Sequence, residues 1–158
     1  MKTRRVRRAF AVLATTALVL TLSIAAHAEL GGTEASVQSD QQKLRGALRV
    51  QRGEAYAVHE IRTESNNVAR EFVSSDGTVF AVTFHGNTPG ESNALLGAYS
   101  AQIAQAMRAQ VGRRHLSGAV TFRIGNIVYE ASGHMRSYHV RAYLADRVPQ
   151  GTALEEIR

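Results

Sequence analysis

The sequence predicts an α+β domain in which an antiparallel sheet of about six strands packs against one long central helix, with a short N-terminal helix. Three observations indicate this fold. Alternating apolar and polar residues recur around short turn sequences, which require antiparallel pairing. One long stretch has apolar residues at helical spacing. That stretch divides the strands into two groups of three, so we expect two three-stranded meanders.

The first 28 residues have the pattern of a cleaved secretory signal peptide. Five basic residues stand in the first eight positions, an apolar run extends from 9 to 26, and Ala26-His27-Ala28 follows. Signal peptidase recognises such a small-x-small sequence, and an Ala- and Thr-rich run favours cleavage over a membrane anchor. We therefore expect an exported protein, periplasmic or secreted, with a single mature domain over 29–158. The general secretory route is favoured, although Arg7-Arg8 weakly resembles a twin-arginine signal.

The mature chain is almost neutral. Without the leader it has 14 Lys and Arg residues against 13 Asp and Glu. The high pI of the whole chain therefore does not support nucleic-acid binding. The chain has no cysteine, which excludes disulfides, thiol catalysis and thiolate metal sites. Past residue 28 no apolar stretch is long enough to span a membrane.

The first half of the mature chain predicts one helix and three strands. Residues 29–36 are expected to be extended or flexible, because their adjacent glycines offer no side chain for packing. A modest helix over 36–46 follows, with serines able to cap it and a glycine to end it. The strands are predicted over residues 55–62, 68–74 and 78–85.

The last two of these strands form a hairpin around Ser75-Asp76-Gly77, whose register the sequence leaves open. A two-residue loop pairs Val73 with Phe80. A three-residue loop instead pairs Phe72 with Phe80, and Val68 with Phe84. We favour the three-residue loop, because it sets aromatic rings side by side on one face.

The clearest helix is predicted over residues 89–111. Thr88 and Glu91 have the spacing of a capping box, and Gly112 suits a left-handed end. Two strands, 119–124 and 127–131, then flank the two-residue loop Gly125-Asn126. A turn at Ser132-Gly133 leads into a last strand over 134–144.

That last strand carries the richest set of polar side chains: His134, Arg136, His139 and Arg141. Alternation places His134 and Arg136 on one face and His139 and Arg141 on the other. Either pair could hold an anionic group. The alternative is a half-exposed strand whose polar residues lie at its rim.

A second candidate set lies on two earlier strands and consists of His59, Glu60, Arg70 and Glu71. A His59–Glu71 pair is possible in one register, and an ordinary cross-strand polar pair is the alternative. The mature histidines do not show the His-Glu-x-x-His spacing of a zinc site. A nucleophile elbow and a phosphate-binding loop are also absent from the sequence, so we expect no metal and no cofactor.

Several segments together resemble a family of small exported proteobacterial proteins that share a domain of unknown function. The most distinctive is Gly133-His134-Met135-Arg136-x-Tyr138-His139-x-Arg141-Ala142-Tyr143. Others are Leu30-Gly31-Gly32, Tyr56-x-Val58-His59-Glu60-Ile61, Arg70-Glu71-Phe72-Val73-Ser74 and Leu95-Leu96-Gly97-x-Tyr99. The resemblance implies export and a single domain, and it implies no activity.

These features favour a non-catalytic module that binds another exported protein or an envelope component. The antiparallel sheet offers edges and an open face on which such a partner could dock. The alternative is a small hydrolase or metal-dependent enzyme that uses His134, Arg136, His139 and Arg141. A third possibility is an assembly subunit that associates through a sheet edge.

Overall fold

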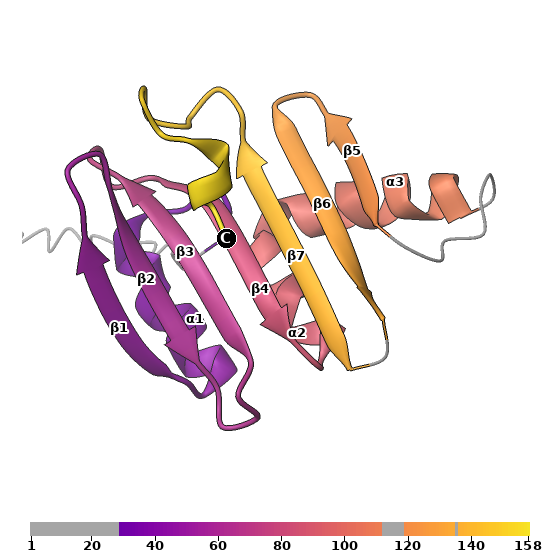
Figure 1. Cartoon of the computed structure of the whole chain (residues 1–158), viewed down its shortest axis with the longest axis horizontal. Coiled ribbons are helices and arrows are strands. Elements are labelled where there is room, and N and C mark those ends of the chain that lie inside the picture. Colours follow the sequence, from indigo (N-terminus) through magenta and orange to yellow (C-terminus); the bar gives the residue numbers. More distant parts are fainter. Residues whose placement is uncertain (1–28, 112–118, 135) are drawn as a thin grey trace, which may run out of the picture.

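The computed structural model describes residues 29–111, 119–134 and 136–158, which form one seven-stranded antiparallel sheet (Figure 1). The strand order is β1-β2-β3-β4-β7-β6-β5. The α+β class and the antiparallel pairing are thereby confirmed, and the number of about six strands is wrong. The strands are β1 (Ala47–Arg52), β2 (Tyr56–Arg62), β3 (Val68–Ser74), β4 (Val79–Gly86), β5 (Val120–Ile124), β6 (Ile127–His134) and β7 (Ser137–Leu144).

The strand that sequence patterning missed is β1, at one edge of the sheet. Five of its six residues are exposed, so it lacks the apolar alternation that marks a half-buried strand. An edge strand needs a partner on one side only and tolerates charged side chains. The N-terminal group is therefore a four-stranded meander, which pairs through β4 and β7 with the three-stranded C-terminal group.

The hairpin of β3 and β4 combines the two registers that the sequence left open. Along most of its length Ala69 pairs with Phe84 and Phe72 with Ala81, which is the register we did not favour. A bulge then shifts the pairing by one residue, so that Val73 pairs with Val79. The bulge leaves Phe80 as the extra residue, so its side chain does not share the face of Val82 and Phe84 and instead lies on the same side as that of its neighbour Ala81.

The long predicted helix is interrupted. It consists of α2 (Pro89–Leu96), the 3-10 turn η2 (Gly97–Tyr99) and α3 (Ser100–Val111). The interruption lies at Gly97, which has φ 51° and ψ −127°, a conformation that favours glycine. There the Glu29 carboxylate accepts a hydrogen bond from the Ala98 N–H at 2.7 Å. The expected stop at Gly112 lies outside the described residues.

The capping box predicted at the start of α2 is wrong. Thr88 makes no side-chain cap hydrogen bond. Glu91 instead accepts a hydrogen bond from Asn67 Nδ2 at 2.8 Å, because the loop before β3 lies against the start of the helix.

The turn between the last two strands is not at Ser132-Gly133. β6 continues to His134, which pairs with Ser137, and Arg136 has the φ of 68° that the tight turn requires. Gly133 is a strand residue where the neighbouring backbone comes very close: a Cβ there would lie 2.9 Å from the Tyr138 Cα. Glycine is needed there because the two strands come too close for a side chain. From the local sequence, such a glycine looks the same as a glycine in a turn.

The pairing of β5 with β6 is confirmed, with Val120 opposite Ala131 and Ile124 opposite Ile127. The N-terminal helix is also confirmed, as η1 (Glu34–Ser36) followed by α1 (Val37–Leu44). Residues 29–36 are extended only in part, since Thr33 bridges Thr78 and Glu34–Ser36 form η1, and they pack against the domain. Leu30 is buried, and the Gly31 N–H donates to the Val79 carbonyl oxygen at 2.8 Å.

The helices cover one face of the sheet and the C-terminal segment crosses the other (Figure 1). α1 packs on β2, α2 on β4 and β7, and α3 on β5. The main core lies between these helices and the sheet. A smaller core on the opposite face joins Phe72, Phe80, Ala81, Tyr143 and Ile157. We call this opposite side the outer face. No helix within the described ranges is long and apolar enough to cross a membrane.

Candidate functional site

The outer face contains a groove of about 570 Å³, within the size range of small-ligand sites. Its floor is formed by β4, β7, β6 and β5, and the C-terminal residues Ile157 and Arg158 lie at its border. Three arginines and one glutamate are among its described lining residues, which makes the lining basic overall. Its polar residues on the strands include Arg70, Thr83, His85, Glu130, His139 and Arg141.

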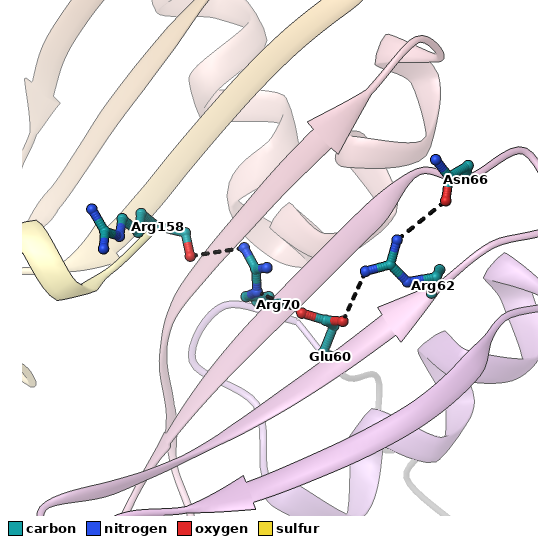
Figure 2. Close-up of polar contacts among 5 residues, drawn as sticks. All are labelled: Glu60, Arg62, Asn66, Arg70 and Arg158. Carbon is teal, nitrogen blue, oxygen red and sulfur yellow. Dashed lines mark hydrogen bonds and ion pairs between the residues drawn. The ribbon is translucent and has the colours of Figure 1, made fainter.

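Arg70 connects the groove to a chain of polar contacts that crosses the outer face (Figure 2). Its Nε donates to Glu60 Oε2 at 2.9 Å, and its Nη1 donates to the main-chain oxygen of Arg158 at 3.0 Å. Arg62 donates to the other oxygen of Glu60, at 3.3 Å. Burial alone would raise the pKa of Glu60, but the hydrogen bonds from Arg70 and Arg62 outweigh burial and lower that pKa.

Arg141 holds the C-terminal segment from the other side. Its Nε lies 2.9 Å and its Nη2 2.6 Å from Glu130 Oε2. Its Nη1 donates to the carbonyl oxygen of Leu154 at 2.8 Å. Together, Arg70 and Arg141 fix the last residues of the chain along the groove, while the fully buried Ile157 anchors them in the outer core.

His139 has a histidine partner from a distant part of the chain. It lies directly opposite His85 in the pairing of β4 with β7, and both side chains are exposed. The ring centroids are 4.1 Å apart, and Nδ1 of His85 lies 3.0 Å from each nitrogen of His139. The two rings form a compact imidazole pair in the lining of the groove.

The structure therefore brings together Arg70, His139 and Arg141, with Glu60 beside them, as parts of one surface. Arg136 lies apart in the exposed turn. The side chain of His134 lies outside the described part of the structure. Alternation along one strand does not relate positions 134 and 139, because a turn places them on different strands.

His59 and Glu71 lie on the opposite face, beneath α1. They are direct neighbours in the pairing of β2 with β3, and their exposed fractions are 4% and 0%. Nε2 of His59 lies 3.2 Å from Glu34 Oε1. Burial lowers the pKa of His59, and Arg52 acts in the same direction, while Glu34 opposes them.

Glu71 is a strongly perturbed buried carboxyl. Neither of its oxygens has a hydrogen-bond partner within the described ranges. Burial raises its pKa to about 8, the Asp40 carboxylate acts in the same direction, and Lys43 acts against them. The sheet separates this buried pair from the groove, so the second predicted set does not form one site.

Sequence reasoning missed His85, Thr83, Glu130, Ser132 and Arg158 as parts of the site. Alternation along residues 78–85 does place Thr83 and His85 on one face. Their proximity to His139 depends on the pairing of β4 with β7, which joins residues 54 positions apart. No local signal reports that pairing.

In the part of the chain that the structure describes, no group of three or more metal-binding side chains gathers. Residues 26–157 match the family model described as "Protein of unknown function (DUF2844)". No curated protein and no solved structure matches the chain.

Proposed function

The chain belongs to the DUF2844 family of proteins of unknown function, and we propose that it is an exported, non-catalytic binding module. Its groove on the outer face holds an acidic segment of another exported polypeptide. The observation that carries this proposal is the basic lining of the groove, in which three arginines accompany one glutamate among the described residues.

The arginines have donors to spare for a carboxylate. A guanidinium has five N–H donors in a fixed fork, which suits carboxylate recognition. Arg70 uses two of its nitrogens in hydrogen bonds recorded among the described residues. Arg158 is exposed at the border of the groove. A carboxylate that reaches the remaining donors of Arg70, or the exposed side chain of Arg158, can therefore bind without breaking the contacts that hold the C-terminal segment.

The volume of the groove and its mixed lining suit a short length of peptide. Its border includes the apolar Ile157, and its floor includes the methyl-bearing Thr121, beside the charged residues. An occupant that carries both apolar atoms and carboxylates fits this lining better than a compact inorganic anion does.

Two further observations support the proposal. The leader sequence over 1–28 favours export, which makes an exported partner accessible. The two predicted sets of polar residues are divided, with His59 and Glu71 buried beneath α1 and His139 and Arg141 in the groove. That division weighs against an enzyme built on both predicted sets.

Titration of the ¹⁵N-labelled 29–158 domain with a tetra-aspartate peptide tests the proposal. We expect amide shifts at Thr83, Ser132 and Arg141, and no comparable shifts with tetra-lysine. Ser132→Trp fills the groove and should weaken binding at least tenfold. Gln51→Trp is the matched control, because Gln51 is exposed on β1, away from the groove.

Equal shifts with the acidic and basic peptides would contradict the proposal. So would binding that Ser132→Trp leaves unchanged. The chemical shifts of free Ser132→Trp show whether the variant retains the fold.

A further inference from the structure

We propose that His85 and His139 form a two-imidazole site for a divalent transition metal, with Cu²⁺ or Ni²⁺ as the fitting ions. The proposal goes beyond the binding of a peptide, and it holds whether or not the groove takes an organic ligand. It rests on the juxtaposition of the two rings across β4 and β7.

The sheet presents both imidazoles to the same small volume. Directly opposite residues of an antiparallel pair project to the same face, so His85 and His139 leave the outer face side by side. Their nitrogens are already 3.0 Å apart. Both rings are exposed, so small side-chain rotations can turn a lone pair of each toward a shared ion.

The separation favours particular metals. Bonds from a metal to imidazole nitrogen are about 2.0–2.1 Å long. Two such bonds to nitrogens 3.0 Å apart meet at the metal at roughly 90°. That angle belongs to square-planar and tetragonal sites, which Cu²⁺ and Ni²⁺ prefer, and tetrahedral Zn²⁺ requires a wider one.

The surroundings allow a cation despite the basic lining of the groove. The Arg141 guanidinium is paired with Glu130, and the Arg70 guanidinium with Glu60, which lowers the positive potential that a metal ion would meet. The hydroxyl-bearing Ser132 is the register partner of His139 on the other side, in β6. Water can complete the coordination, because the pair lies at an open surface.

The composition of the chain removes the strongest competing ligands. The sequence has no cysteine, so no thiolate binds the metal or reduces Cu²⁺. With only two protein ligands proposed, each imidazole should account for a large part of the affinity. We therefore expect loss of either ring to weaken binding at least tenfold.

Calorimetric titration of the untagged 29–158 domain with Cu²⁺ and with Ni²⁺, at about pH 7.5, tests the site. We expect one metal per chain. His85→Asn and His139→Asn should each weaken binding at least tenfold. His59→Asn is the matched control, because His59 is a histidine of the same chain that lies on the opposite face of the sheet, and the folded variant should bind like the wild type.

Electron paramagnetic resonance of the Cu²⁺ complex provides a second measurement. We expect a tetragonal signal with hyperfine coupling to two nitrogens, which is lost in the double variant His85→Asn/His139→Asn. A double variant that is folded by circular dichroism and binds as tightly as the wild type would overturn the proposal. So would a wild type that binds neither metal.

Discussion

Replacing Glu71 with Gln removes a buried titratable group and leaves the size of the side chain almost unchanged. Glu71 has no exposed surface, and burial raises its pKa from 4.5 to about 8. A carboxyl whose pKa is raised on folding is preferred in its protonated form by the folded state. Its favourable contribution is therefore complete below pH 4.5 and is lost as the pH rises to about 8.

The size of the effect follows from the difference between the two pKa values. Between them, the free energy of unfolding falls by about 1.4 kcal/mol for each pH unit. From pH 5 to pH 8 the loss due to Glu71 is about 3.5 kcal/mol. Glutamine does not titrate, so Glu71→Gln should lack this part of the pH dependence and should be the more stable protein at pH 8.

Urea unfolding of the 29–158 domain, measured from pH 5 to pH 8, gives the comparison. The lowered pKa of His59 acts in the opposite direction, because that contribution is lost as the pH falls below 6.5. It is common to the two proteins and is removed when their unfolding free energies are subtracted.

Glu60→Gln is the matched control, because it removes the same charge from the outer face. Salt bridges to Arg70 and Arg62 lower the pKa of Glu60, so its contribution is lost only as the pH falls below 4.5. The unfolding free energy of this variant should change with pH in the same way as that of the wild type between pH 5 and pH 8. If the unfolding free energies of the wild type and Glu71→Gln had the same pH dependence, the reasoning about the buried carboxyl would be refuted.

Two further predictions concern the C-terminal segment and the helix interruption. The Arg141 guanidinium contacts both Glu130 and the Leu154 carbonyl oxygen, and the single ammonium of Arg141→Lys cannot keep both contacts. The rate of amide hydrogen exchange at residues 154–158 should therefore rise at least tenfold. An unchanged exchange rate would show that Ile157 alone holds the segment. Gly97→Ala should destabilise the domain by about 2 kcal/mol or more, because its Cβ would overlap the Glu29 side chain at positive φ. In the control variant Gly77→Ala the new Cβ meets nothing within 4 Å, so the positive φ alone should lower the free energy of unfolding by about 1 kcal/mol. Equal losses of unfolding free energy in the two variants, measured with urea, would contradict the proposed overlap at Gly97.

Much of the fold follows from local patterning. The hairpin at Gly125-Asn126 has the predicted register, because a two-residue loop fixes which residues face each other. The class of the fold also follows, since short turns leave antiparallel pairing as the only choice. The pattern does not reveal β1. Its residues are mostly exposed on both faces, so apolar and polar side chains do not alternate along it.

The candidate site depends more strongly on contacts between distant residues. The sequence indicates His139 and Arg141 as partners on one strand, because alternation is a local property. It does not indicate that β7 pairs with β4, which brings His85 to His139, or that Ile157 folds back beside Arg70.

The sequence by itself determined the antiparallel α+β class and most of the element positions, and it indicated an exported, thiol-free domain. Only the tertiary structure decided which polar residues share a surface. Periodicity reports the face on which a side chain lies along its own strand, whereas the order of strands in the sheet is set by burial of the whole core. For this reason His59 and Glu71 lie under a helix, and Arg70 and Arg141 border the groove.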